Sequence, residues 1–230
     1  MTVTPRERAR EQTLAEITRI GREHLATHGA AALSLRAVAR DLGVVSSAVY
    51  RYVASRDELL TLLVVDGYTE LGGEVDAAVD ALPADDHRGR MHALARAVRA
   101  WAVREPARYA LLFGSPVPGY HAPAERTTGP GTRVVVAMVG IIEAAYRAGG
   151  IALSETPVDP GLAVDLDRIR SEMGLTVPDG LLARGVTAWA ALFGAVNFEV
   201  FGQYGADTFA DPAALFEHQL VVLDQLLGLA

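Results

Sequence analysis

Residues 35–53 have the sequence LRAVARDLGVVSSAVYRYV, which describes two short helices joined by a tight turn. Ser34 provides an N-cap for a helix over 35–42, and Gly43 ends that helix and allows the turn into a second helix over 46–53. Small and apolar residues recur where two helices can pack at a steep angle. We assign the shared core to Val38, Ala39, Leu42, Val44 and Val49. The pattern predicts a helix-turn-helix hairpin.

The second helix of this hairpin leaves small hydroxyls, an arginine and two tyrosines outside the shared core. Such side chains suit insertion into the major groove of DNA, where residues at the helix N-terminus meet base edges and flanking residues meet phosphates. The alternative is a hairpin that only packs, with Tyr50 and Tyr52 as core aromatics. Charge favours DNA: residues 1–60 carry nine Arg against seven acids and sum to +2, whereas the remaining residues sum to −9.

The rest of the chain has helical periodicity and no strand-like alternation. The expected helices outside the hairpin cover 10–27, 55–82, 86–101, 105–113, 132–148, 159–173, 178–204 and 211–227. Four Gly and four Pro predict a loop over 114–131. We therefore expect an all-α protein, with a three-helix DNA-binding domain over 1–54 and a larger helical domain for effector binding and dimerisation over 55–230.

Composition excludes several classes of protein. The 230 residues are 50% hydrophobic with a net charge of −7 and no cysteine, which removes disulfides, thiolate nucleophiles and Cys-based zinc sites. No uninterrupted apolar stretch has the length of a membrane span, and the charged N-terminus has no apolar core typical of a signal peptide. We expect a cytoplasmic protein with no membrane partner.

Enzyme and metal sites find little support in the sequence. No G-x-S-x-G elbow, G-x-G-x-x-G fingerprint or phosphate loop is present. His24 and His28 lie four residues apart, a spacing that can bind zinc on one helical face, but no acid supplies an obvious third ligand. We expect no catalytic residues, no metal and no cofactor. The alternative function is a helical small-molecule-binding protein or enzyme whose hairpin does not touch DNA.

Residues 10–63 resemble the N-terminal domain of the TetR (tetracycline-repressor) family of bacterial regulators. The segment GVVSSAVYRYVASRDELL over 43–60 follows the family signature nearly throughout, with Val53 where the family usually has Phe and Arg56 where it has Lys. The resemblance implies phosphate contacts by Ser34, Arg36, Tyr50 and Arg56. It implies base contacts by Ser46, Ser47, Ala48, Arg51 and Tyr52.

The segment before the hairpin leaves two alternatives open. Arg6, Arg8 and Arg10 lie along the DNA backbone or in the minor groove, or they belong to a solvated tail. In either case the family resemblance implies a double-stranded, palindromic operator as partner.

The C-terminal part supports a homodimer. Residues 189–194, WAALFG, are similar to the Trp-His-Gly signature of one TetR-type C-terminal domain, with Phe193 in place of His. Residues 181–201 are apolar nearly all round and must be buried on more than one side. We expect the last two long helices to pair with those of a second subunit, which fits an operator of two half-sites.

A group of aromatic residues is the candidate effector site. A mostly apolar cavity is predicted from Trp101, Tyr109, Phe113, Tyr120, Trp189, Phe193 and Asn197. The alternative is that each aromatic only fills the core. The expected loop over 114–131 adjoins this group as a mouth or lid. The predicted function is a ligand-responsive repressor that a small-molecule effector releases from its operator.

Overall fold

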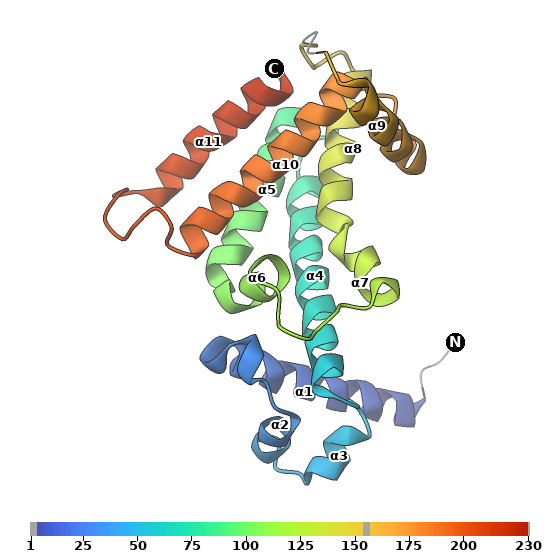
Figure 1. The fold of residues 1–230 in the computed structure, drawn as a ribbon, viewed down its shortest axis with the longest axis vertical. Coiled ribbons are helices and arrows are strands. Elements are labelled where there is room, and N and C mark those ends of the chain that lie inside the picture. The colour runs from blue at the N-terminus through green and yellow to red at the C-terminus, as the bar shows by residue number, and fades with distance from the viewer. Residues whose placement is uncertain (1–3, 154–156, 230) are drawn as a thin grey trace. The chain divides into compact units, whose positions relative to one another are not determined.

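The computed structural model describes residues 4–153 and 157–229 of the chain (Figure 1). These ranges hold eleven α-helices and one 3₁₀ helix. Across the same ranges, the one pairing of extended backbone is an isolated antiparallel bridge between Ile151 and Leu229. The predicted all-α class is confirmed. The helices form two compact units, one of residues 1–70 and 104–131, the other of residues 71–103 and 132–230.

Unit 1 is built around the predicted hairpin. Its elements are α1 (Pro5–His28), η1 (Ala30–Ala32), α2 (Leu35–Asp41), α3 (Ser46–Tyr50), the first part of α4 (Arg56–Asp80), α6 (Pro106–Phe113) and α7 (Ala124–Gly131). Its core joins apolar residues of α1, α2, α3 and α4, among them Ile17, Val38, Val49 and Leu60. Gly21 lets α1 approach α4, since a Cβ there would lie 3.2 Å from a methyl carbon of Leu59.

Unit 2 contains the last part of α4, nearly all of α5 (His87–Arg104), α8 (Arg133–Arg147), α9 (Pro160–Met173), α10 (Asp179–Val200) and α11 (Pro212–Leu227). The N-terminal caps of α9 and α11 form as expected, because Asp159 accepts from Gly161 N–H and Asp211 from Ala213 N–H. By length and composition α10 could cross a membrane, yet Leu192 and Val196 of this helix are buried within unit 2.

The loop expected over 114–131 and the expected start of the first helix are wrong. The segment 114–131 is a loop only in its first half, because α7 begins at Ala124 and includes Pro130 in its last turn. The Thr127 hydroxyl donates to the carbonyl oxygen of Pro123 (2.9 Å) and supports the first turn of α7. The first helix begins at Pro5 instead of residue 10, because Thr4 and Glu7 form a capping box.

Candidate nucleic-acid interface

The turn between α2 and α3 is built around Gly43. Gly43 has a φ of 72°, in the left-handed region that favours glycine. Its N–H donates to the carbonyl oxygen of Arg40 (3.0 Å), and the N–H of Val44 donates to that of Ala39 (3.0 Å). These bonds end α2 and lead the chain into α3, so the predicted glycine turn is confirmed.

The hairpin core follows the prediction except at one position. Val38, Ala39 and Val49 are buried, and Leu42 packs against the same core. Val44 is 40% exposed, so its assignment to this core is wrong. Val44 lies in the turn itself, directly after the positive-φ glycine and before α3, where neither helix covers it.

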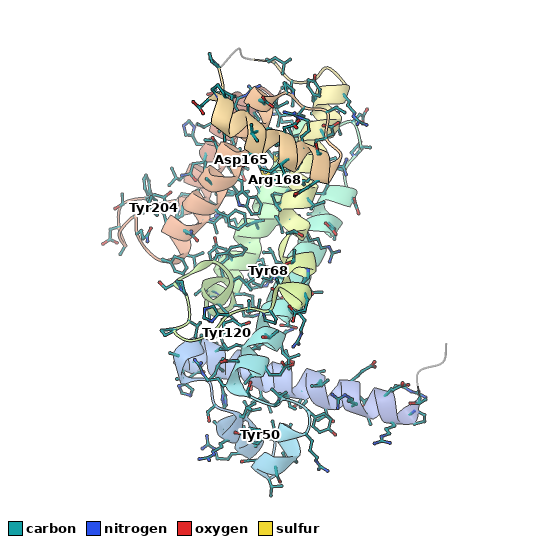
Figure 2. The ribbon with its side chains drawn as sticks, turned by 45° about the vertical axis from the view of Figure 1, so that its right-hand side comes forward. Tyr50, Tyr68, Tyr120, Asp165, Arg168 and Tyr204 are labelled. Carbon is teal, nitrogen blue, oxygen red and sulfur yellow. The ribbon has the colours of Figure 1, made fainter. Side chains whose placement is uncertain are left out.

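The residues predicted to face bases lie on α3 and on the turn that follows it. Ser47 and Arg51 are exposed, while Ser46, Ala48 and Tyr52 are half-buried. A third exposed side chain, the predicted phosphate contact Tyr50, lies on α3 (Figure 2). Ser47, Tyr50 and Arg51 share one side because they are spaced three and four residues apart. α3 is shorter than predicted, since it ends at Tyr50 instead of residue 53.

Val45 is a residue of this surface that the sequence interpretation missed. It occupies the N-cap position of α3, makes no side-chain capping hydrogen bond, and is 72% exposed. Polar N-caps stabilise helices by about 1 kcal/mol over aliphatic ones, so valine is an unfavourable choice here. The sequence feature that could have indicated an exposed valine here is the aliphatic pair Val44 and Val45, directly before two serines.

The predicted phosphate-binding residues flank the hairpin in different environments. Ser34 is the N-cap of α2 and makes no capping hydrogen bond with its hydroxyl, and Arg36 in the first turn of α2 is exposed. The Nη2 of Arg56 donates to the carbonyl oxygens of Ala30 (2.9 Å) and Ala31 (3.3 Å). The guanidinium of Arg56 thus ties the start of α4 to η1.

The three arginines before the hairpin belong to α1 and not to an extended tail. Arg6, Arg8 and Arg10 are exposed along the first two turns of this helix. The guanidinium carbon of Arg10 lies 5.6 Å from the ring centre of Tyr52, a cation–π distance. This contact links the start of α1 to the end of the hairpin.

His24 also connects α1 to the hairpin. Its Nε2 lies 2.6 Å from a carboxylate oxygen of Asp41 at the end of α2, and this hydrogen bond lowers the pKa of Asp41. The ring of His28 packs against that of His24 edge to face. Within residues 4–153 and 157–229, no three His, Cys, Asp or Glu side chains are grouped as a metal site.

A second missed feature is an ion cluster of Arg22, Asp66, Glu70 and Arg108, called here the Arg108 cluster. Arg108 of α6 has a side chain only 4% exposed, and it donates to Asp66 (2.8 Å) and to both carboxylate oxygens of Glu70 (2.9 Å each). Arg22 of α1 pairs with the same Asp66 (2.7 Å). The cluster therefore joins α6 to α4 and α1 inside unit 1.

Electrostatics keep Arg108 charged despite its burial. Burial by itself lowers the pKa of Arg108, but the hydrogen bonds with Glu70 and the nearby negative charges outweigh it and raise the pKa above its usual value. A buried cation of this kind must keep its carboxylate partners, because an unpaired charge in the same place is costly. The periodicity of the sequence placed Arg108 inside a short apolar helix but gave no sign of its partners.

The predicted effector residues do not form one group within either unit. Tyr109, Phe113 and Tyr120 belong to unit 1, whereas Trp101, Trp189, Phe193 and Asn197 belong to unit 2. Trp101 and Tyr109 are fully buried, and burial raises the pKa of Tyr109.

The aromatic residues pack in pairs. The rings of Tyr109 and Phe113 lie 5.1 Å apart, and those of Trp189 and Phe193 lie 4.2 Å apart. The hydroxyl of Tyr120 (Figure 2) lies 3.1 Å from the hydroxyl of Thr61. Of the predicted set, Trp189 lines a cavity of unit 2 between α8, α9 and α10.

The last two helices expose apolar side chains on unit 2. Phe198 and Phe201 near the end of α10 are 49% and 41% exposed, and Val222 on α11 is 49% exposed. A shallow apolar depression between these two helices includes Phe198 and Val222 in its lining. Exposed large apolar side chains that gather on neighbouring helices are typical of a protein interface.

Comparison with known proteins identifies two family regions in the chain. Residues 17–63 match the family described as bacterial regulatory proteins, tetR family. Residues 91–223 match the tetracyclin repressor-like C-terminal domain. The first region contains the whole hairpin, and the second begins within α5 and ends within α11.

Individual relatives agree with these regions. The HTH-type transcriptional regulator Rv1816 of Mycobacterium tuberculosis is 51% identical over 226 residues, which cover 98% of this chain and 97% of the relative. The regulator Mb1846 of Mycobacterium bovis matches to the same extent.

Solved structures show the same fold. The crystal structure of the protein SCO4313 has 37% identity and a TM-score of 0.77, covering 96% of this chain and 98% of that one. A protein of unknown function from Rhodococcus sp. RHA1 has 22% identity, a TM-score of 0.67 and coverage of 94% and 95%, and shows the fold alone. The chain belongs to the TetR family of bacterial regulatory proteins and is a DNA-binding transcriptional regulator, not an enzyme.

Proposed function

We propose that this regulator binds a palindromic operator as a homodimer and is released from it by a small-molecule effector, as a repressor in the cytoplasm. The observation that carries the DNA part is the exposed, mostly polar surface of α3 on a firmly packed hairpin. A helix of this kind fits the major groove, and its flanking cations neutralise phosphates.

The roles of individual residues in this proposal follow two kinds of contact. Base edges are contacted by Ser46, Ser47, Ala48, Arg51 and Tyr52. Phosphates are contacted by Ser34, Arg36, Tyr50 and Arg56. The Arg56 contact requires the guanidinium to reach a phosphate beyond the carbonyl oxygens of η1 that it now binds.

Salt dependence tests these roles. Arg36→Ala removes one phosphate contact, so binding weakens for all sequences and the slope of log affinity against log salt falls by about 1. Ser47→Ala changes the preferred bases instead. Arg168→Ala, an exposed position on α9, is the control and leaves both properties unchanged. Fluorescence anisotropy at several salt concentrations measures all three variants. Equal slopes for Arg36→Ala and wild type contradict the assignment.

The dimer proposal rests on the exposed apolar side chains of α10 and α11. A second copy of the same two helices covers them, and the two-fold axis brings two copies of α3 to two half-sites. Val222→Asp places a charge in this interface without disturbing the core of one subunit, since Val222 is half-exposed. Val164→Asp on α9 is the matched control, with an exposure of 70%.

Sedimentation velocity at micromolar concentration separates the outcomes. We expect dimers for the wild type and the Val164→Asp control, and monomers with weakened operator binding for Val222→Asp. A monomeric wild type that still binds the operator tightly contradicts the proposal.

The effector part rests on unit 2, where Trp189 of the predicted set lines an apolar cavity. Binding of a ligand raises the melting temperature by mass action and lowers operator affinity through reciprocal coupling. The population of released protein then follows the effector concentration.

A further inference from the structure

Unit 2 contains an apolar cavity of about 180 Å³ between α8, α9 and α10. Its walls are aliphatic and methionine side chains together with Trp189, with Gly185 as the position that has no side chain. Val139 and Ile142 come from α8, and Ile169 and Met173 from α9. In Figure 1 these three helices lie together at the end of unit 2.

Gly185 contributes to this space, because it is the lining position of α10 that has no side chain. A Cβ at Gly185 would meet the terminal methyl of Ile142 at 3.4 Å, an ordinary contact. Alanine therefore fits this position, and glycine leaves the volume empty.

Polar contacts outside the cavity hold its walls. Arg170 of α9 donates to the carbonyl oxygen of Val177 (3.0 Å) and pairs with Asp179 at the start of α10. Glu143 of α8 accepts hydrogen bonds from the Thr176 N–H (2.9 Å) and hydroxyl (2.6 Å). These bonds fix α9 and the α9–α10 connection to their neighbours.

The chemistry of the lining selects the occupant. A carboxylate or ammonium group inside would lose its hydration and find no partner, which is strongly unfavourable. A cavity of about 150 Å³ lined by similar side chains stays dry and binds benzene or xenon. Asp165 and Arg168 of α9 pair at 3.0 Å (Figure 2), and both side chains are exposed and do not belong to this lining.

We propose that the α8–α9–α10 cavity binds an uncharged hydrocarbon group of about the size of a benzene ring, and that this group is the apolar part of the effector. The link to operator release rests on the proposed function, whereas hydrocarbon binding does not. The site differs from the predicted aromatic set, with which it shares only Trp189.

Toluene is the probe, and two valines of α8 provide a matched pair. Val139→Phe fills the cavity, whereas Val136→Phe adds the same ring at a position that is 52% exposed and outside the lining. At about ten times the dissociation constant, toluene is expected to raise the melting temperature of the wild type and of Val136→Phe by about 3 °C. Val139→Phe shows no rise.

Gly185→Ala covers the case in which Val139→Phe does not fold. Its added methyl reduces the cavity with only an ordinary contact, so toluene affinity falls while the fold is kept. Xenon NMR of the unmodified protein gives an independent readout, with one bound xenon environment that toluene displaces.

Operator affinity is measured with the same variants. Toluene is expected to lower the operator affinity of the wild type and Val136→Phe, but not that of Val139→Phe. The proposal is overturned if toluene does not stabilise the wild type, if Val139→Phe responds equally, or if bound toluene leaves operator affinity unchanged. If the chain binds no DNA sequence, the proposed function fails, and the melting and xenon measurements still decide whether the cavity binds hydrocarbon.

Discussion

Replacing Arg108 by methionine removes the buried cation of the Arg108 cluster while it keeps a long, helix-compatible side chain. In the structure this guanidinium donates three hydrogen bonds of 2.8–2.9 Å to Asp66 and Glu70. Without it, two carboxylates on neighbouring turns of α4 face each other across the space that the cation occupied. Unit 1 is then expected to open more readily at α6 and α1.

The expected loss of stability follows from how far Arg108 and its two carboxylate partners are buried. Removing one partner of a buried ion pair costs about 3–5 kcal/mol. Asp66 and Glu70 are 22% and 31% exposed, so water partly hydrates them after the substitution, and Arg22 still lies near both. We therefore expect the free energy of unfolding of unit 1 to fall by about 2–3 kcal/mol, below the centre of that range.

Hydrogen exchange measures this change where it occurs. A loss of 2–3 kcal/mol corresponds to amide exchange about 30- to 150-fold faster in the peptides of α1 and α6. Trp101 and Trp189 both lie in unit 2, so the unfolding transition seen by tryptophan fluorescence is an internal control that shifts less. Arg19→Met, which removes an exposed arginine of α1, should leave exchange unchanged. Wild-type exchange rates in Arg108→Met would refute the reasoning.

Three further predictions concern other parts of the chain. Because Val45 is an exposed aliphatic residue beside α3, we expect it to contact a thymine methyl group. Replacing that thymine by uracil should weaken operator binding by the wild type about fourfold and leave binding by Val45→Ser unchanged. Equal losses for the two proteins contradict this contact. Burial alone raises the pKa of Glu143, but hydrogen bonds from Thr176 outweigh burial and lower this pKa below 4.5. The wild type should therefore have a higher melting temperature than Glu143→Gln above pH about 5, and the difference should disappear as the pH falls through the lowered pKa. Melting temperatures of the two proteins that change in parallel with pH count against this. Asp224→Ala should destabilise unit 2 by about 1–3 kcal/mol, because it removes the buried carboxylate that Arg88 (2.7 Å) and His92 (2.8 Å) contact. An unchanged free energy of unfolding in urea contradicts this.

The hairpin was predictable from the sequence because its determinants are local. Gly43 must adopt a positive φ, and Val38 and Leu42 share one helical face four residues apart, so the two helices and their turn follow from neighbouring residues. The N-caps Asp159 and Asp211 were predictable for the same reason.

Features that depend on distant residues were not predictable in this way. Pro130 and its neighbouring glycines favoured a loop, yet α7 forms within unit 1, where Arg126 pairs with Glu58 of α4 at 2.8 Å. The Arg108 cluster joins residues more than thirty positions apart, and periodicity carries no information on such pairs. The cavity of unit 2 arises from the spacing of three helices, which composition does not determine.

The central claim is that two copies of α3, related by a two-fold axis, bind two half-sites on one face of the DNA. Sites selected from random DNA should be palindromic, with half-site centres one helical turn or a multiple of it apart. The decisive measurement is the affinity for a selected site before and after insertion of about five base pairs at its centre, which places the half-sites on opposite faces of the duplex. The account predicts that the insertion reduces specific binding to the level of random DNA. Selected sites without two-fold symmetry, or an affinity that the insertion does not change, would contradict it.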